Sequence, residues 1–592
     1  MIDEHIAHML RNRAEKYDLR EVFRYKIENT YHSINWRTFK NQSEIIASFL
    51  LNCGVNIQDN IGIFSYNCPQ WTIADLAILS CRCVIVPFYS TSTTQQLEYI
   101  INETEMKILF IGDEEQVQKA LPLLNIDTCS LELIITFNCP QQKDDRVIEL
   151  ETIMNSNYSN RTQTELAERL NSGQSSDLAT IIYTSGTTGE PKGVMLDHSN
   201  FMASFRIHKK RLSVDDTDIS LCFLPLSHIF ERGWTYFLLY SGGTNVYNKD
   251  PKEITKELPI VQPTVMCVVP RFFEKVYDRI ISVSEEGGTI KKSIFNWSIA
   301  VGHKYIEYQK DDIKTPYLLS IKHSVADKLV FSKIRKFFGN QIKFMPCSGA
   351  AMTPELKRFF HALGIFVNYG YGATETLATV SCMRSDKYDF NYTGEIMPEI
   401  EVKISEDNMI LVKGETIFKG YYKKPEQTNE VLIDGWYYTG DQGQLTGNNQ
   451  LYMSERIKDI IKTSTGKYIS PQKIELLLSK SEMIEQTCII GDSRHYITAL
   501  LVPAYEKLSE WLKQKGETIS EVNQMITHKM VQTYFEEIIE EIQSELPIHE
   551  QIVKFALLPE PFTIENGMLT NSLKVRRKQV ISCYQNLIES LY

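Results

Sequence analysis

Residues 180–200, TIIYTSGTTGEPKGVMLDHSN, constrain this chain more than any other stretch of its sequence. The apolar residues 178–183 predict a buried strand, and the next ten residues hold three glycines, four hydroxyl side chains and one lysine. Glycine lets backbone N–H groups converge on an anion, while hydroxyls and a lysine add donors and charge. The stretch therefore predicts a phosphate-binding loop for a nucleotide triphosphate. Its predicted ligand-binding residues are Thr184, Ser185, Gly186, Thr187, Thr188, Gly189 and Lys192.

This stretch has two other interpretations. The P-loop of nucleotide hydrolases needs Gly-Lys-Ser/Thr after four spacer residues, opening a helix, whereas Lys192 lies here between Pro191 and Gly193. A solvated glycine-rich surface turn would explain the glycine and serine but not the ordered mixture of residues.

Length and composition limit the class of protein. At 592 residues the chain is too long for one core, and about 150 residues per domain predicts two to four structural units. A hydrophobic content of 43% indicates a globular enzyme, and a net charge of −11 argues against a nucleic-acid partner. No apolar run reaches the roughly 18 residues of a transmembrane helix, and the charged N-terminus does not resemble a signal peptide. A cytoplasmic protein is expected.

The twelve cysteines predict neither disulfides nor a zinc site. They are scattered singly except for Cys81 and Cys83, and none forms a CxxC pair or a Cys/His spacing that suits zinc. Reduced, mostly buried thiols are expected.

The first third of the chain reads as a doubly wound α/β layer. An apolar run at residues 61–64, a helical stretch at 71–80 and a second apolar run at 83–88 predict a βαβ unit with parallel strands. Residues 108–113 and 131–137 predict two more strands. The polar residues 151–176 are expected to form a connection into the phosphate loop.

A second strand–helix–strand cycle follows at residues 342–369. Residues 342–350 predict a strand and a glycine turn, Thr353 and Pro354 are the expected cap and first residue of a helix, and Gly364 is expected to end it. Both predicted loops follow the carboxyl ends of strands, where open α/β sheets bind ligands.

Short strand-like runs and turns follow residue 394, and a domain boundary is expected near Glu455. We therefore expect a large domain at 1–455 and a small C-terminal lid at 456–592. Two helix-like stretches and the apolar strands at 486–490 and 498–503 predict an α+β fold for the lid.

These motifs, from about residue 183 to 577, resemble the adenylate-forming superfamily of AMP-dependent synthetases and ligases, and most closely its bacterial long-chain fatty acid–CoA ligases. The resemblance implies a large domain of doubly wound sheets with a β-rich subdomain and a mobile lid.

The run NYGYGATET, residues 368–376, matches the adenine and magnesium motif of that superfamily. Tyr371 could stack on a purine, and Glu375 offers a hard oxygen that suits Mg²⁺. The resemblance implies that Glu375 and Thr184 bind the metal ion. The residues it implies for the nucleotide here are Gly349, Ala350, Tyr369, Gly370, Tyr371, Gly372 and Thr374.

Asp441 and Arg456 are the expected pair for the ribose hydroxyls, because a carboxylate makes stronger hydrogen bonds than a neutral acceptor. An ordinary surface salt bridge is the alternative from these residues alone. The resemblance implies that His228, in FLPLSHIFERGW, borders the pocket where the acid meets ATP, although a lone histidine is more often a core residue. Trp234 is offset from the aromatic residue that gates the acyl tunnel in some long-chain relatives, so the resemblance does not decide whether Trp234 has this role.

The lid motif SERIKDIIKTSTGKY is similar to the hinge and glycine-hairpin motifs of the superfamily. It implies a hinge at Lys458, a ligand-binding role for Lys462, and entry of Gly466 into the active site during thioester formation. Lys574, in LTNSLKVRR, matches the mobile catalytic lysine, and a cationic tail is the alternative. Glu455 and Asn571 stand where glycine and proline are usual.

The resemblance implies a ligase that joins a long-chain fatty acid to CoA through an acyl-adenylate, with ATP, Mg²⁺ and CoA as cofactors and co-substrates. Lys192, His228, Gly466 and Lys574 are its expected catalytic residues. The alternatives are a fatty acyl-AMP ligase that serves a carrier protein, a synthetase for another carboxylic acid, and an inactive nucleotide-binding regulator. Peripheral contact with the inner face of a membrane is one route by which such a ligase could take up its substrate.

Overall fold

The computed structural model describes residues 3–139, 144–156, 158–184, 191–310, 313–456, 461–465, 467–544, 546–570 and 573–592. The chain divides into two compact units. The larger unit comprises Met1–Thr184, Lys192–Thr439 and Gly443–Met453, and most of the smaller unit is Ser454–Tyr592.

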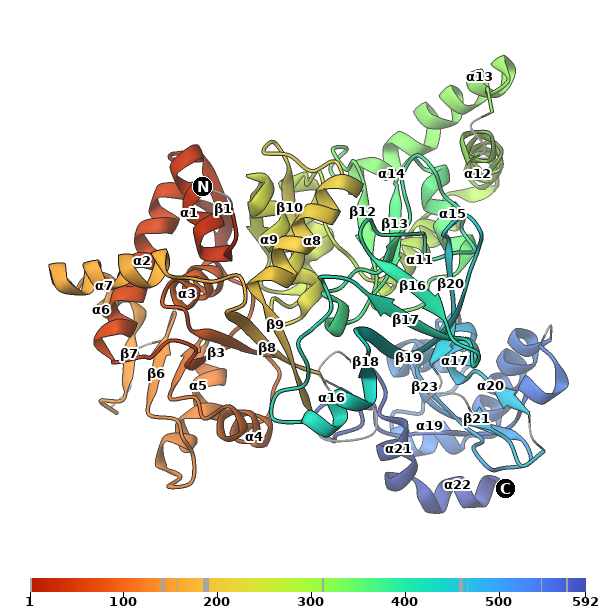
Figure 1. The fold of residues 1–592 in the computed structure, drawn as a ribbon. Coiled ribbons are helices and arrows are strands. Elements are labelled where there is room, and N and C mark those ends of the chain that lie inside the picture. Colours follow the sequence, from red (N-terminus) through yellow and green to blue (C-terminus); the bar gives the residue numbers. More distant parts are fainter. Residues whose placement is uncertain are drawn as a thin grey trace. The chain divides into compact units, whose positions relative to one another are not determined.

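The first sheet of the larger unit has seven strands in the order β7-β6-β5-β3-β4-β8-β9. Figure 1 labels β7, β6, β3, β8 and β9 of this sheet. Six strands run parallel, and β9 alone pairs antiparallel, with β8. This confirms the predicted doubly wound layer. The strands are β3 (Asn60–Phe64), β4 (Val84–Phe88), β5 (Ile108–Ile111), β6 (Leu133–Thr136), β7 (Val147–Glu149), β8 (Leu178–Thr184) and β9 (Lys192–Asp197).

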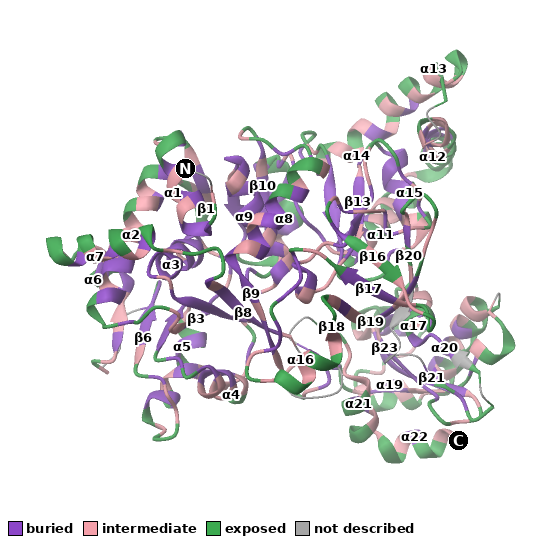
Figure 2. Cartoon of the chain, in the orientation of Figure 1, coloured by how far each residue is buried: buried purple, intermediate pink, exposed green. Residues whose placement is uncertain are grey.

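Both faces of this sheet are covered because its strands are apolar on both sides. Within β5, Phe110 faces one core cluster, and its neighbours Leu109 and Ile111 face another. The first cluster includes side chains of α1 (Ile6–Tyr17), α2 (Trp36–Asn52) and α3 (Pro69–Ser80), and the second includes side chains of α4 (Thr94–Thr104) and α5 (Glu114–Ala120). The strands are accordingly buried along most of their length (Figure 2).

The expected polar connection at residues 151–176 includes two helices that were not predicted. These are α6 (Leu150–Met154) and α7 (Asn160–Asn171). Ser159 caps α7 by accepting a hydrogen bond from the Thr162 backbone N–H, at 3.3 Å. A narrow stripe of Thr162, Leu166 and Leu170 is all that α7 buries, so its apolar periodicity is weak.

The second sheet contains the predicted strand–helix–strand cycle. β12 (Met345–Cys347) and β13 (Val367–Tyr371) are parallel and are joined by α15 (Pro354–Ala362). Thr353 caps α15 as predicted, accepting from the Leu356 N–H at 3.3 Å. β14 (Ser381–Cys382) and β15 (Glu395–Ile396) continue this sheet.

Isolated bridges through Val265 and Val268 link β12 to a further group of strands, ordered β10-β11-β1-β2. These are β1 (Glu21–Ile27), β2 (Thr30–Asn35), β10 (Ile219–Cys222) and β11 (Thr244–Tyr247). The N-terminal hairpin β1–β2 thus joins strands that lie some two hundred residues later in the chain, a pairing that no local sequence pattern predicts.

A helical segment lies between β11 and β12 in the sequence, and so separates the two groups of strands along the chain. It comprises α10 (Ile254–Val261), α11 (Pro270–Glu286), α12 (Gly288–Lys310), α13 (Tyr317–Ala326), a π-helical turn (Asp327–Phe331) and α14 (Ser332–Phe337). Over the described ranges, none of the helices combines the length and apolar content needed to cross a bilayer.

The short strands predicted after residue 394 form a five-stranded sheet. Its order is β16-β17-β19-β18, and β20 pairs with β19. The strands are β16 (Glu401–Ile404), β17 (Met409–Lys413), β18 (Leu432–Ile433), β19 (Trp436–Leu445) and β20 (Leu451–Arg456).

The smaller unit has the α+β fold predicted for the lid. The predicted apolar strands are β23 (Ile484–Ile490) and β24 (Ile497–Pro503), which pair antiparallel. A third strand, β25 (Ile552–Leu557), was not predicted, because only its first and last residues are buried and its sequence forms no apolar run. The surrounding helices are α17 (Pro471–Leu478), α18 (Tyr505–Gln514), α19 (Val522–Thr527), α20 (Lys529–Gln543), α21 (Arg577–Cys583) and α22 (Gln585–Leu591).

Candidate active site

The predicted phosphate loop connects the two strands of a hairpin. Thr184 ends β8, Lys192 begins β9, and the two residues are paired in the antiparallel register. The Thr184 hydroxyl donates to the Lys192 carbonyl at 3.4 Å. Because a strand and not a helix follows the loop, the P-loop interpretation is excluded. The predicted residues Ser185, Gly186, Thr187, Thr188 and Gly189 lie outside the described residues.

A segment from a distant part of the chain pairs with β9. The Met195 N–H donates to the Gly420 carbonyl at 3.1 Å, and the Tyr422 N–H donates to the Gly193 carbonyl at 2.8 Å. This pairing places the ring of Tyr421 beside Lys192, whose Nζ lies 4.8 Å from the ring centroid. Lys192 is therefore held against an aromatic face at the end of the strand pair.

Tyr421 also contacts the predicted metal ligand. Its hydroxyl donates to Glu375 Oε1 at 2.9 Å, and the Phe418 N–H donates to the Glu375 carbonyl at 2.9 Å. Burial, and next the charge of Glu375, raise the pKa of Tyr421, so its hydroxyl stays protonated as a donor. Tyr421 thus joins Lys192 to Glu375. No short motif in the sequence indicates Tyr421, because only long-range strand pairing brings it to the site.

Glu375 suits a magnesium ion that is shared with substrate phosphates. Mg²⁺ is usually held by one or two carboxylates together with phosphates and water, rather than by a cage of protein ligands. The described residues include no group of three or more His, Cys, Asp or Glu side chains that could hold a metal ion. Glu375 contacts Tyr421, which lies beside Lys192, and Lys192 pairs with Thr184 at the end of the β8–β9 hairpin. A single carboxylate in this position fits an ion that phosphates and water also bind.

The two predicted nucleotide loops of the second sheet contact each other. The Tyr369 hydroxyl donates to the Ala350 carbonyl at 3.0 Å, which ties the end of β13 to the turn after β12. Gly349 in that turn has a φ of +92°, a conformation that favours glycine.

Close backbone packing explains the two glycines of YGYG. A Cβ at Gly370 would lie 2.6 Å from the Ser381 carbonyl oxygen, and one at Gly372 would lie 2.0 Å from the Ala378 oxygen. Glycine is therefore required at both positions to shape the loop. Tyr371 and Thr374 are buried beside it, and purine stacking by Tyr371 stays a prediction.

His228 is the N-cap of α9 (Ile229–Ser241), where its Nδ1 accepts from the Phe230 N–H at 3.2 Å. The helix is anchored by Arg232, whose guanidinium pairs with Asp75 at 2.7 Å and donates to the Thr180 hydroxyl at 2.7 Å. All three anchoring residues are buried. Since Thr180 lies on β8, this network fixes the helix that begins at His228 relative to the strand that enters the phosphate loop.

Glu231, in the first turn of the same helix, is a buried carboxyl group. Its Oε2 accepts from the Leu224 N–H at 3.1 Å and from the Cys267 thiol at 3.4 Å, and its Oε1 has no hydrogen-bond partner among the described residues. Burial raises the pKa of Glu231 to about 8. The carboxyl group therefore holds the loop before His228 while carrying a proton at neutral pH.

We expect Glu231 to make the protein less stable as the pH rises from 5 to 8. The unfolded carboxyl ionises near its ordinary pKa of 4.5, whereas the folded one ionises near 8, so unfolding releases a proton in this window. The unfolding free energy should fall by up to about 1.4 kcal/mol per pH unit from this group. Glu231→Gln should remove that slope, as measured by denaturant unfolding at several pH values. The exposed control Glu401→Gln should keep it, and an unchanged slope in Glu231→Gln would contradict the assignment.

A small pocket lies between α9 and the YGYG loop. Its lining includes His208, Phe230, Trp234, Gly370 and Ala378, and its volume is about 40 Å³. That is room for about three water molecules, far less than a long acyl chain needs. The Trp234 indole donates to the Ser220 hydroxyl at 2.9 Å, which fixes the ring in the pocket wall.

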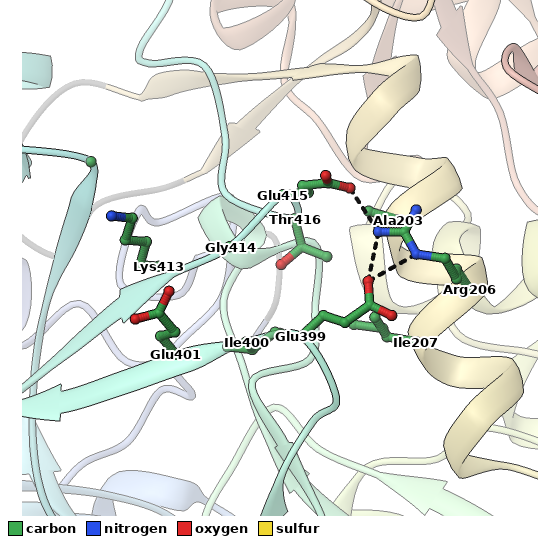
Figure 3. Close-up of a pocket in the computed structure, with 11 residues that line it drawn as sticks. Ala203, Arg206, Ile207, Glu399, Ile400, Glu401, Lys413, Gly414, Glu415 and Thr416 are labelled. Carbon is green, nitrogen blue, oxygen red and sulfur yellow. Dashed lines mark hydrogen bonds and ion pairs between the residues drawn. The ribbon is translucent and has the colours of Figure 1, made fainter.

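A larger pocket of about 370 Å³ lies between α8 (His198–Arg211) and the segment 399–416 (Figure 3). Arg206 bridges Glu399 and Glu415 across it, each at 2.7 Å. None of the predicted site residues lines this pocket, so it is separate from the predicted nucleotide site.

The remaining predicted residues lie on β19, on β20 and in the smaller unit. Asp441 is buried on β19, and Arg456 ends β20. Lys462 lies on β21 (Ile461–Lys462), which pairs with β22 (Tyr468–Ile469) in a hairpin. Lys458 and Gly466 lie outside the described residues.

Lys574 lies in a tight turn near the C-terminus. Its N–H donates to the Thr570 hydroxyl at 3.0 Å, and its carbonyl accepts from the Thr570 N–H at 2.8 Å. The bridge between Leu569 and Val575 closes this turn.

The parallel sheet, the hairpin at its edge and the Lys192–Tyr421–Glu375 group define a nucleotide-binding α/β enzyme. Residues 10–422 match the model of the AMP-binding enzyme family, and residues 458–592 match that of the AMP-binding enzyme C-terminal domain. The chain belongs to the AMP-binding enzyme family.

Named relatives align along nearly the whole chain. It is 30% identical to the long-chain-fatty-acid–CoA ligase FadD15 of Mycobacterium bovis, over 96% of this chain and 94% of that protein. It is 31% identical to the long-chain-fatty-acid–CoA ligase 5 of Mus musculus, over 96% of this chain and 85% of that protein.

Solved structures share the fold. The A domain of a carboxylic acid reductase from Segniliparus rugosus, in complex with AMP and a carboxylic acid, superposes with a TM-score of 0.73 at 21% identity, over 100% of this chain and 94% of that one. The o-succinylbenzoate CoA synthetase of Bacillus subtilis, in complex with AMP, gives a TM-score of 0.69 at 18% identity, over 97% of both chains.

Proposed function

We propose that this protein is a long-chain fatty acid–CoA ligase, which converts ATP, a fatty acid and CoA into acyl-CoA, AMP and diphosphate. The observation that carries the proposal is the Lys192–Tyr421–Glu375 group, which brings an ammonium and a carboxylate to the end of the β8–β9 hairpin. The substrate class rests on the named long-chain relatives, which match over 96% of the chain.

In the first half-reaction, the fatty acid carboxylate attacks the α-phosphorus of ATP and diphosphate leaves. Lys192 would offset the negative charge that develops on the phosphates, and His228 would orient the carboxylate. Glu375 and Thr184 would hold Mg²⁺, which supplies positive charge to the phosphate oxygens when bound. Tyr421 would keep the Glu375 carboxylate oriented through its hydrogen bond.

The nucleotide itself would be held by the loops of the second sheet and by β19. Tyr371 would stack on the adenine, and Asp441 with Arg456 would bind the ribose hydroxyls. The remaining residues proposed to line the nucleotide site are Ser185, Gly186, Thr187, Thr188, Gly189, Gly349, Ala350, Tyr369, Gly370, Gly372, Thr374 and Lys462.

In the second half-reaction, the CoA thiolate attacks the acyl-adenylate. We propose that residues 456–592 rotate about Lys458 between the two steps, so that Lys574 serves the first step and Gly466 the second. The proposed boundary of this lid, after Glu455, lies close to the start of the C-terminal family match at residue 458.

The acyl chain is proposed to enter beside Phe230 and Trp234. Since the pocket there holds only about 40 Å³, the chain must displace side chains as it enters. We further propose that the enzyme is cytoplasmic and takes its fatty acid at the inner face of a membrane.

Chain length should govern catalytic efficiency. Each buried methylene contributes about 0.8 kcal/mol, so we expect kcat/KM for palmitate to exceed that for acetate by at least about a hundredfold. Incubation with ATP, Mg²⁺, CoA and a series of fatty acids, with products identified by mass spectrometry, measures this. Higher efficiency with acetate or benzoate would reject the long-chain assignment, and adenylate without thioester would favour a carrier-protein ligase.

A further inference from the structure

Helix α13 presents a stripe of large apolar side chains to solvent. Tyr317 and Leu318 are 79% and 72% exposed, and Ile321, Val325 and Leu329 follow at helical spacing, all exposed. Twenty large apolar side chains are exposed in the described parts of the chain, and half of them lie between residues 283 and 329. Such clustering within one helical segment marks an interaction surface, because scattered single exposures are the norm.

The neighbouring helix adds to this surface. On α12, Ile290 is 78% exposed, and Ile294 and Trp297 are also exposed at spacings of four and three residues. The two helices pack against each other, and the rings of Tyr305 and His323 stack between them at 3.8 Å. Figure 1 shows this helix pair extending from the rest of the larger unit, and Figure 2 shows the exposed outer side of α13.

The same segment is basic within an acidic protein. Residues 288–336 hold ten lysines and arginines and four aspartates and glutamates, a formal charge of +6, whereas the whole chain carries −11. Lys304, Lys322 and Lys328 are exposed, and the described residues offer them no ion pair. Exposed lysines beside exposed apolar and aromatic side chains are typical of helices that lie on anionic membranes.

Charge decides between the occupants that this surface could take. A second copy of the chain that docked through the same surface would bring +6 against +6, which disfavours a symmetric dimer through this surface. An anionic bilayer complements the charge and also accepts the apolar side chains, which water does not.

We infer that α13 and the adjoining exposed part of α12 form a docking surface for bilayers that contain anionic phospholipid. The helix pair would lie along the headgroup region, with the side chains of Tyr317, Leu318 and Ile321 inserted among the acyl chains. Docking would give the enzyme access to a fatty acid dissolved in the membrane, and this role rests on the proposed function. The inference that the surface binds a bilayer does not.

The test is co-sedimentation of the full chain with vesicles of phosphatidylcholine alone and of phosphatidylcholine with about 30% phosphatidylglycerol, without substrate. We expect binding to the phosphatidylglycerol vesicles that weakens as salt rises. Replacing Tyr317, Leu318 and Ile321 together by serine should weaken binding at least about tenfold, and so should replacing Lys304, Lys322 and Lys328 together by glutamate.

Matched controls lie in the smaller unit. Ile548→Ser with Val553→Ser removes two apolar side chains that are 87% and 57% exposed, and replacing Lys480, Lys513 and Lys529 by glutamate makes the same change in charge. Both controls should bind like the wild type. No binding of the wild type, or equal losses in the controls, would overturn the inference.

Two further readouts separate the remaining outcomes. Dimerisation in analytical ultracentrifugation that the serine variant abolishes would show that the surface serves self-association, and would also overturn the inference. Vesicle binding without acyl-CoA formation from any fatty acid would reject the proposed function and leave the docking surface standing. Acyl-CoA formation without vesicle binding would reject the docking surface and leave the proposed function standing.

Discussion

Glu375→Gln is expected to reduce adenylate formation by at least about a hundredfold at limiting Mg²⁺, with the fold intact. Glutamine keeps the shape of the side chain and can still accept the hydrogen bond from Tyr421, but it removes the charge that would hold the ion. Because this loss falls on the step that expels diphosphate, ATP–diphosphate exchange should decline together with adenylate yield.

The experiment is a Mg²⁺ titration of fatty-acid-dependent exchange for wild type, Glu375→Gln and Tyr421→Phe. Tyr421→Phe keeps the ring beside Lys192 but removes the donor to Glu375, so an intermediate loss of about tenfold is expected. Glu415→Gln, which removes an exposed carboxylate from the neighbouring segment, should behave as wild type. Unchanged exchange in Glu375→Gln at limiting Mg²⁺ would rule out its role as a metal ligand.

Local sequence signals predicted much of the first sheet and of the second cycle. Apolar runs between turn residues specify β3, β4 and β8, and Thr353 with Pro354 specifies the start of α15. These signals suffice because each element is defined by residues that lie close together in the chain.

Long-range pairing accounts for most of what was missed. The register of β1 with β11 depends on strands some two hundred residues apart, and no short pattern encodes that pairing. The same limit applies to the site. Glu375 and Lys192 were identified from their motifs, whereas Tyr421 was not, since its place between them depends on the pairing of residues 419–422 with β9.

Burial was likewise not evident from residue type. Glu231 appeared in the sequence as one charged residue in a mixed motif, yet the structure encloses it among Leu224, Cys222 and Cys267. A carboxyl group in such surroundings changes its proton affinity, which no pattern of neighbouring residues in the chain reveals.

Lys574→Ala and a bulky substitution at Gly466 are expected to disable different half-reactions. If Lys574 contacts the phosphates only while the adenylate forms, its loss should slow that step by about a hundredfold or more, since a charged contact made in the transition state can supply several kcal/mol. Thioester synthesis from supplied acyl-AMP should largely persist. The turn should survive the change, because the hydrogen bonds of Thr570 to the backbone of Lys574 do not need the lysine side chain.

Gly466→Leu should have the opposite effect, because a side chain there would block the close backbone approach proposed for the second step while leaving diphosphate exchange near normal. Both half-reactions are measured on both variants: exchange for the first, and acyl-CoA formation from synthetic acyl-AMP for the second. Lys578→Ala removes an exposed lysine four residues from Lys574 and should affect neither step. Equal loss of both steps in each variant would mean that the lid does not alternate, because a lid fixed in one position would expose both steps to either substitution.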